Sequence, residues 1–340
     1  RIRGQPMSAV LLQICLGLSA CVHALHVAAT GPTPFSSAHI PYRLHALQLQ
    51  SVPSSRSQAP APSALEWPLL RSLRQCINDF ELVQPGDKIA VAVSGGKDSS
   101  TLAYLLRQLK LRRLLPFDDW GFVTVHLDQV QPGHDPSTLA TWLSTQGIAF
   151  ELLREDTYSV VTEKTAAGKS YCALCSRLRR GILYSAAEQL GCNKLALGHH
   201  RDDALETLLL NMCHQGQLKA MPARYVSARG VDVIRPLMYC AEGDIEALAR
   251  EQSFPILPCN LCGSQPDGTP GQRQQMKLLL SALDTVGDGK ARQNMLRALS
   301  DVRPTHLLDC SLRVACGLDS ATGEVLHERG RVVAHYEERH

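Results

Sequence analysis

The feature that most constrains this chain is a stretch near residue 95, where a buried strand runs through a glycine turn into a helix. Residues 89–93 (IAVAV) alternate small and β-branched side chains, as in a strand buried on both faces. Residues 94–96 (SGG) break the strand, and residues 98–100 (DSS) provide polar caps for a leucine-rich helix. Free backbone N–H groups, the helix dipole and the charge of Lys97 would hold a phosphate there. The stretch therefore predicts an anion site in an α/β fold.

The run SGGKDS at residues 94–99 lacks the GxxxxGK[ST] spacing of a Walker A loop. It resembles instead the PP-loop of ATP pyrophosphatases, which split ATP into AMP and pyrophosphate while adenylating a substrate. An ordinary glycine turn is the alternative, but six consecutive matching residues between a strand and a helix favour the nucleotide site. On this resemblance the residues that bind the pyrophosphate portion of ATP are Ser94, Gly95, Gly96, Lys97, Asp98 and Ser99.

Composition and cysteine spacing narrow the class of protein. The chain has 340 residues, of which 44% are hydrophobic and 20% charged, as in a globular protein with an ample core. Its net charge of +3 is too small to indicate a nucleic-acid partner without local basic patches. The twelve cysteines are scattered except for the pairs Cys172/Cys175 and Cys259/Cys262. In a chain of this size, paired CxxC spacing predicts a metal or cluster site, with iron and zinc both open.

Residues 1–65 contain no Asp or Glu and read as a targeting leader. The apolar run at 9–29 suits a secretory signal, and the Ser/Pro/Ala/His-rich segment at 31–63 has the character of a transit peptide. This order predicts a bipartite leader that directs the protein to an organelle, with a plastid favoured over a mitochondrion. The alternatives are a membrane anchor, or a stretch of untranslated region included in the sequence by mistake. If the leader is not functional, the protein would be cytoplasmic. After leader removal we expect no stable membrane association.

The rest of the chain alternates strand and helix patterns. Strands are predicted at 89–93, 121–127, 149–154, 194–198 and 231–234, and helices at 65–81, 138–145, 171–190, 204–213, 242–251, 274–283 and 291–299. The alternation predicts an α/β fold, in which a parallel twisted sheet is flanked by helices and followed by C-terminal helices. This domain would span residues 66–315, with a charged tail at 316–340. Residues 217–225 are predicted to form a basic loop.

Polar side chains gather where predicted strands end, the edge at which parallel sheets bind ligands. Asp128 follows one strand, and the run HHRDD at 199–203 follows another. From these positions His199, Asp128 and Asp203 are candidate site residues, although a solvated loop carboxylate or a helix cap would also explain the aspartates. Basic residues beside them are candidates for RNA phosphate contact, or else a plain solvated face: Arg177, Arg179, Arg180, Lys219 and Arg224.

Seven segments together resemble the TtcA-type tRNA 2-thiocytidine synthetases, from about residue 70 to about residue 312. They are SGGKDS (94–99), LDQVQPG (127–133), CALCSRLRRGILY (172–184), GHHRDDALETLLLNM (198–212), LKAMP (218–222), VIRPLMYC (233–240) and PCNLCGSQ (258–265). The sequence departs from that family at His134-Asp135, in a short insertion at 267–271 and in the leader. None of these departures touches a motif residue.

The resemblance implies a sulfurtransferase that uses ATP to replace the C2 oxygen of cytidine 32 in tRNA by sulfur. It also implies a 4Fe–4S cluster held by Cys172, Cys175 and Cys259, with Cys262 as a non-ligand. Three protein ligands leave one iron open for an exogenous sulfur, whereas four would close the site.

The implied reaction passes through an adenylated base, with Lys97 at the pyrophosphate and Mg²⁺ neutralising the charge that develops. Asp98 is the first candidate for holding Mg²⁺, and Asp203 the second. The expected partners are tRNA, a cysteine desulfurase or other sulfur donor, and possibly a second copy of the chain. The rival functions are a non-catalytic tRNA-binding zinc protein and a tRNA 2-thiouridine synthetase.

Overall fold

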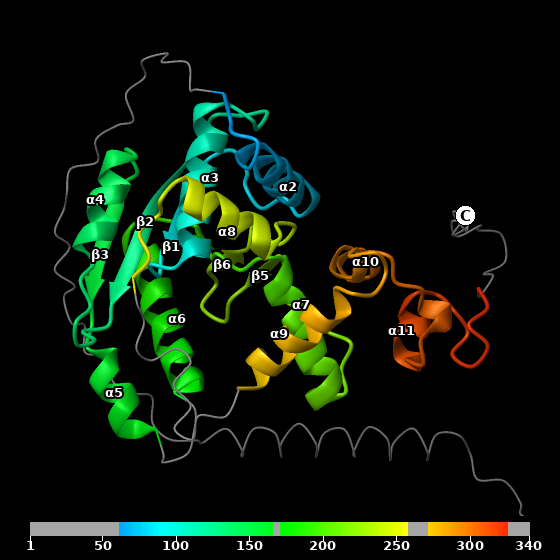
Figure 1. The fold of residues 1–340 in the computed structure, drawn as a ribbon. Helices are drawn as coiled ribbons and strands as arrows, with labels where there is room; N and C mark the ends of the chain where they lie inside the picture. Colours follow the sequence, from blue (N-terminus) through cyan, green and yellow to red (C-terminus); the bar gives the residue numbers. More distant parts are fainter. Residues whose placement is uncertain (1–60, 166–170, 258–270, 326–340) are drawn as a thin grey trace, which may run out of the picture. The chain divides into compact units, whose positions relative to one another are not determined.

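The computed structural model describes residues 61–165, 171–257 and 271–325 (Figure 1). Apart from residues 61–65, the predicted leader lies outside the described residues, and so does the Cys259/Cys262 pair. Within the described ranges, none of the helices has the length and apolarity needed to cross a membrane.

The described residues contain a six-stranded sheet with the order β3-β2-β1-β4-β6-β5. The strands are β1 (Asp87–Ala92), β2 (Trp120–Asp128), β3 (Phe150–Arg154), β4 (Lys194–Ala196), β5 (Arg224–Val226) and β6 (Asp232–Ile234). All neighbouring pairs are parallel except β5 and β6. The predicted parallel sheet is therefore confirmed, with an antiparallel strand added at one edge.

The strand order reverses between β1 and β4, and this places the predicted site. From β1 the chain continues to β2 and β3 on one side, and returns to β4 and β6 on the other. Val91 of β1 pairs with both Thr124 of β2 and Ala196 of β4, so the carboxyl ends of the three strands meet at one edge. Ligands bind in the crevice at such a reversal point. The PP-loop residues, Asp128 and residues 199–203 all follow strands that end there.

Each face of the sheet is covered by helices (Figure 1). One face packs against α2 (Glu66–Asp79), α3 (Lys97–Leu111) and α8 (Glu242–Glu251), and the other packs against α6 (Cys172–Gln189). The alternation in β1 explains this, because Ile89 and Val91 enter the core below α3 while Ala90 enters the core below α6. Burial on both faces requires the continuous apolar run seen in the sequence.

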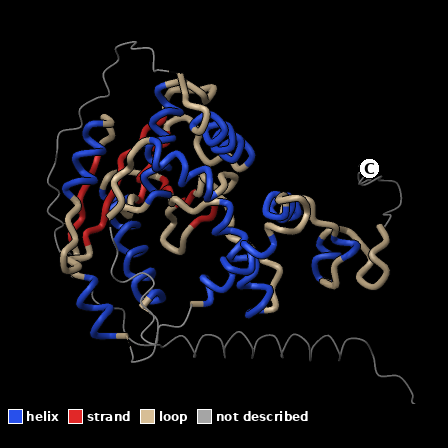
Figure 2. Tube along the Cα trace, in the orientation of Figure 1, coloured by secondary structure: helices blue, strands red, loops and turns tan. Residues whose placement is uncertain are grey.

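The remaining helices lie around this unit (Figure 2). They are α4 (Ser137–Thr145), α5 (Thr157–Lys164), α7 (Arg201–Leu210), the π-helical turn η1 (Asn211–Gln215), α9 (Gln272–Leu283), α10 (Ala291–Ala298), the 3₁₀ turn η2 (Pro304–His306) and α11 (Cys310–Ala315). A separate apolar cluster joins α7 to α9 through Leu205, Leu209, Met276 and Leu280. The C-terminal helices are thereby attached to the helix that follows β4.

Several short elements were not predicted, among them β5, α5, η2 and α11. Residues 217–225 were expected to form a loop throughout, but β5 begins at Arg224, where three residues pair with β6. A run of three residues is too short to show the two-residue period of a strand. Helix α5 was also missed, since only Thr157 and Val161 are buried; its start is capped by Asp156, which accepts a hydrogen bond from the Ser159 N–H at 2.9 Å.

A buried ion pair at the amino edge of the sheet generates a stability prediction. Lys194 Nζ lies 2.7 Å from Asp87 Oδ2, and both side chains are at most 5% exposed. Replacing Lys194 by Met would leave the Asp87 carboxylate buried without its cation, which typically costs about 3–5 kcal/mol. Chemical denaturation should show a loss of this size for Lys194→Met. Lys88→Met, at an exposed position on β1, should change the unfolding free energy by less than about 0.5 kcal/mol. Equal losses in the two variants would contradict this account.

Candidate functional site

The PP-loop is folded tightly around two serine side chains. The Ser94 N–H donates to Ser99 Oγ at 3.1 Å, and the Ser99 hydroxyl donates to the Gly96 carbonyl at 3.1 Å. Gly95 has a φ of +83°, a value that favours glycine. The Leu257 N–H donates to the Gly95 carbonyl at 2.8 Å, and a Cβ on Gly95 would lie 2.8 Å from the Leu257 side chain. The loop conformation therefore needs glycine for both its backbone angle and its packing.

A third glycine, which the sequence analysis missed, brings a second loop against the first. A Cβ on Gly198, after β4, would lie 2.9 Å from the backbone N and Cα of Ser99. Because the obstructing atoms are backbone, a larger residue would displace the start of α3. The signal was present in the sequence, since Gly198 opens the GHHRDD run.

The PP-loop lysine is held by two carboxylates. Lys97 Nζ lies 3.0 Å from Asp98 Oδ1 and 3.1 Å from Glu242 Oε1 at the start of α8. Burial lowers the pKa of Lys97, but the two carboxylates more than offset this effect, so its pKa is raised and the side chain stays protonated. Glu242 was not predicted, because it lies 145 residues from Lys97 along the chain.

Asp98 and Asp203, both predicted site residues, lie close to the same side chain, that of His200. His200 Nε2 lies 3.7 Å from Asp98 Oδ1 and 3.5 Å from Asp203 Oδ2, and the imidazole is buried. Asp203 also caps α7, since its Oδ2 accepts a hydrogen bond from the His200 N–H at 3.0 Å. The predicted helix cap is therefore confirmed, while the role of Asp203 at the site stays a prediction.

The neighbouring Asp202 is fully buried and has a different environment. Its Oδ1 lies 2.6 Å from Arg292 Nη1 of α10, and its Oδ2 accepts a hydrogen bond from the Glu242 N–H at 2.8 Å. Burial raises the pKa of Asp202, but these contacts outweigh burial and lower its pKa. Asp202 thus ties α7 to α8 and α10.

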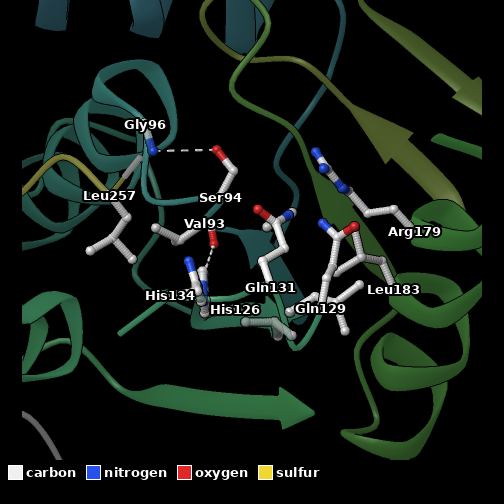
Figure 3. Close-up of a pocket in the computed structure, with 13 residues that line it drawn as sticks. Val93, Ser94, Gly96, His126, Gln129, Gln131, His134, Arg179, Leu183 and Leu257 are labelled. Atoms are coloured by element: carbon white, nitrogen blue, oxygen red, sulfur yellow. Dashed lines mark hydrogen bonds between the residues drawn. The ribbon is translucent and has the colours of Figure 1, made fainter. Parts of the chain in front are cut away.

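A cavity of about 170 Å³ opens beside the PP-loop (Figure 3). Ser94 and Gly96 line one side, Gln129 and Gln131 come from the segment that follows β2, and Arg179 comes from α6. The other lining residues are Ala92, Val93, Val125, His126, Leu127, His134, Leu183 and Leu257. The two glutamines were not predicted as site residues, although both belong to the LDQVQPG segment. Apolar walls with a few amides and one guanidinium fit an organic ring system.

A histidine pair forms part of this cavity wall. His126 Nδ1 lies 2.7 Å from the Val93 carbonyl oxygen, so Nδ1 carries the proton and donates. His126 Nε2 then accepts from His134 Nε2 at 3.0 Å. Burial lowers the pKa of His126, which favours this neutral form. His134, one of the positions that depart from the TtcA-type pattern, thus faces the cavity.

The first cysteine pair lies at the start of α6, as predicted. Cys172 is exposed and Cys175 is buried. The Cys175 thiol donates to Gln129 Oε1 at 3.3 Å, and Arg179 Nη2 donates to Cys175 Sγ at 3.7 Å. Gln129 and Arg179 therefore contact Cys175 and also line the cavity beside the PP-loop. Cys259 lies outside the described residues, and within them no three His, Cys, Asp or Glu side chains are grouped to hold a metal ion.

Two candidates for nucleotide contact lie outside the cavity lining. The Asp128 carboxylate accepts a hydrogen bond from the Val130 N–H at 2.8 Å and lies 3.7 Å from Arg154 Nε. His199 Nδ1 accepts from Arg235 Nε at 3.2 Å. Burial lowers the pKa of His199 to about 4, against the opposing effect of Asp203, so this side chain is neutral near pH 7. Their roles in nucleotide binding stay predictions.

The five basic residues predicted to contact RNA are placed differently from one another. Arg177, Arg180 and Lys219 are exposed, whereas Arg179 lines the cavity. Arg224 forms an ion pair with Asp232, with Nη2 and Oδ2 2.8 Å apart, and donates to the Glu81 carbonyl. Arg224 is exposed like Arg177, Arg180 and Lys219, but its charge is already paired with a carboxylate.

Sequence comparison assigns the chain to a family. Residues 65–256 match the family model described as the PP-loop domain. The chain is 49% identical over 257 residues to the tRNA-cytidine(32) 2-sulfurtransferase of Sorangium cellulosum, covering 75% of this chain and 88% of that protein. The enzyme of the same name from Coxiella burnetii is 47% identical over 249 residues, covering 73% and 94%. This chain belongs to the tRNA-cytidine(32) 2-sulfurtransferase family. The resemblance seen in its motifs is thereby confirmed.

A solved structure with a related fold is the U34-tRNA thiolase NcsA from Methanococcus maripaludis, determined with its 4Fe–4S cluster. The TM-score is 0.55, over 71% of this chain and 80% of NcsA. At 19% sequence identity this match supports the fold of the tRNA-cytidine(32) 2-sulfurtransferase domain, and it does not transfer individual residues.

The packing at Gly198 generates a prediction for nucleotide binding. In Gly198→Ala the new methyl group must push the backbone of Ser99, and such overpacking typically costs about 1–3 kcal/mol. We expect a lower Tm and a smaller rise in Tm when ATP is added, measured by differential scanning fluorimetry. Gly121→Ala, where a Cβ has nothing within 4 Å, is the control and should keep the ATP-induced rise in Tm. An unchanged ATP response in Gly198→Ala would contradict this role for Gly198.

Proposed function

We propose that this protein uses ATP to replace the C2 oxygen of cytidine 32 in tRNA by sulfur. The observation that carries the proposal is the position of Cys175, which shares Gln129 and Arg179 with the cavity beside the PP-loop. An activating site and a sulfur-handling site are therefore adjacent. Its curated relatives are named for this reaction.

The chemistry follows from the poor leaving ability of the C2 oxygen. Attack of that oxygen on the α-phosphorus of ATP forms an AMP ester and releases pyrophosphate. Sulfur then adds to C2, and the C–O bond breaks with AMP as the leaving group. In this scheme the N–H groups at the start of α3 and the Lys97 ammonium bind the phosphates. The cavity lined by Gln129, Gln131 and Arg179 receives the nucleoside or the target base.

Mg²⁺ is a proposed cofactor that would neutralise charge on the phosphates. Asp98 and Asp203 are the residues to hold it, directly or through water. Their fit is supported by the shared proximity of both carboxylates to His200 Nε2, which places two hard oxygen donors at the end of the PP-loop.

We propose that Cys172, Cys175 and Cys259 hold a 4Fe–4S cluster, which when bound supplies an open iron for sulfur. Arg179 Nη2 donates to Cys175 Sγ at 3.7 Å, so a cationic donor lies beside this proposed ligand. Leu257, bonded to the PP-loop carbonyl of Gly95, precedes Cys259 by two residues in the sequence.

The proposed partners follow from the same surface. Arg177, Arg180 and Lys219 would contact tRNA phosphates, while the target base is splayed out of the anticodon loop into the cavity. A cysteine desulfurase or another donor would supply sulfur, and a second copy of the chain is a further candidate partner. The acid-free leader would direct the protein to a plastid.

Removing the PP-loop charge tests the proposed function. We expect Lys97→Ala to lower the rate of 2-thiocytidine formation by about a hundred- to a thousandfold, the typical cost of losing one preorganised charge-stabilising contact. Thiocytidine in digested tRNA is the readout, and an unchanged circular dichroism spectrum shows that the fold is kept. Lys88→Ala, at the opposite end of β1, should retain full activity. Unchanged turnover in Lys97→Ala would remove the PP-loop from the mechanism.

The cysteine pairs separate the proposed enzyme from a zinc-binding protein. We expect Cys172→Ala, Cys175→Ala and Cys259→Ala each to lose iron, visible absorption and thiolation, whereas Cys262→Ala keeps more of the cluster. All four should still bind ATP, because the PP-loop folds without cluster ligands. Chelation of iron should abolish thiolation in the wild type. Cys213→Ala, an exposed cysteine outside both pairs, is the control. Stoichiometric zinc with equal loss in all four variants would overturn the iron–sulfur assignment.

A further inference from the structure

One oxygen atom of Glu242 connects the PP-loop lysine to the C-terminal helices. Glu242 Oε1 lies 3.1 Å from Lys97 Nζ and 2.8 Å from Lys277 Nζ of α9. The Lys97 and Glu242 side chains are 23% and 18% exposed, so solvent screens their contact only partly. Lys277, at 51%, is the more exposed end of this chain of charges.

The backbone of Glu242 is fixed independently of its side chain. Its N–H donates to Asp202 Oδ2 at 2.8 Å, and Asp202 is held by Arg292 of α10 at 2.6 Å. Burial raises the pKa of Glu242, but Lys277 and Lys97 outweigh burial and lower its pKa, so the carboxylate stays ionised. Glu242 is thus a charged group at a fixed point, anchored through helices that lie outside the sheet unit.

The geometry restricts where Lys97 can point. An ammonium group has three N–H donors. Two of them are directed to Asp98 and Glu242, which leaves one direction for a ligand. Asp98 is the next residue on α3 and moves with Lys97, so Glu242 is the contact that orients the ammonium against a separate part of the fold.

We propose that Glu242 is a positioning residue for Lys97 and that Lys277 adjusts its strength by competing for the same carboxylate oxygen. This inference rests on the proposed function, in which Lys97 binds the phosphates of ATP. With Lys277 in place, the Glu242 charge is shared and Lys97 can be drawn toward a phosphate. Without Lys277, Glu242 would retain Lys97 and compete with ATP. Helix α9 thereby becomes part of the nucleotide site without touching the nucleotide.

Steady-state kinetics of tRNA-dependent AMP formation, catalysed by the full-length chain, separates the role of Glu242 from that of Lys277. Losing a hydrogen bond to a charged group typically costs about ten- to a hundredfold, so Glu242→Ala should lower kcat by a factor in that range with a smaller change in the KM for ATP. Glu242→Gln keeps an acceptor oxygen and should recover most of the rate. Lys277→Met should act differently, raising the KM for ATP by about threefold to tenfold with a smaller change in kcat.

The double variant Glu242→Ala/Lys277→Met gives the decisive result. If Lys277 acts on Lys97 through Glu242, as proposed, the double variant should match Glu242→Ala alone, whereas independent roles would multiply the two effects. Glu251→Ala is the matched control, because Glu251 is an exposed carboxylate at the other end of α8 and accepts a hydrogen bond from Gln252 Nε2 at 3.0 Å. It should behave as wild type. If Glu242→Ala is insoluble, Glu242→Leu, which also removes both acceptor oxygens, and its double variant with Lys277→Met replace it in the cycle.

Failure of this inference differs from failure of the proposed function. The positioning role alone would be overturned if Lys97→Ala is inactive while Glu242→Ala keeps the wild-type kcat. Multiplied effects in the double variant, again with Lys97→Ala inactive, would have the same meaning. Full activity in Lys97→Ala would overturn the PP-loop mechanism and this inference with it.

Discussion

The site depends on backbone segments that approach more closely than side chains would allow. At Gly95 the missing Cβ leaves room for Leu257, and at Gly198 it leaves room for the backbone of Ser99. These two contacts bring the loop after β1, the loop after β4 and the segment leading to Cys259 to one point at the carboxyl edge of the sheet. The position of Lys97, the cavity and the two carboxylates near His200 all follow from this approach. A methyl group at either glycine would separate the segments.

Charge at this edge is organised in pairs, and burial makes each pair matter. Asp202 is fully buried and stays ionised because Arg292 and the Glu242 N–H compensate the lost hydration. The same contacts fix the start of α8, from which Glu242 reaches Lys97. These ion pairs and hydrogen bonds connect α3, α7, α8, α9 and α10 through specific atoms. The apolar cluster between α7 and α9 holds its two helices together without fixing the position of individual polar atoms. Ionic contacts therefore determine the orientation of the PP-loop lysine.

The cavity and the first cysteine pair share the side chains of Gln129 and Arg179. The proposed reaction first activates a base and then delivers sulfur to it, so shared side chains keep the sites of these two steps close together. Both contacts meet at the Cys175 sulfur, because Arg179 donates to it while Gln129 accepts from the thiol.

Local and periodic features of the sequence were sufficient for the architecture and for the PP-loop. The apolar run of β1, the glycine turn and the amphipathic helices predicted the parallel sheet and its ligand-binding edge, since these patterns depend on neighbouring residues. Short elements such as β5 and α5 escaped because three to eight residues with few buried positions show no period. The family was predicted from motifs that are each a continuous stretch of sequence and can be found without knowing the fold.

Tertiary structure alone decided which of the charged residues work together. Glu242 reaches Lys97 across 145 positions of sequence, and Arg292 reaches Asp202 across 90. Nothing local marks such pairs, because a carboxylate at a helix start or an arginine in an amphipathic helix is equally consistent with a solvated surface. Likewise Arg179 and Arg180 are adjacent in sequence, yet one lines the cavity and the other is exposed, because helical rotation separates their directions by about 100°. Sequence patterns determine which elements form and which edge binds ligands, whereas long-range packing determines which side chains meet there.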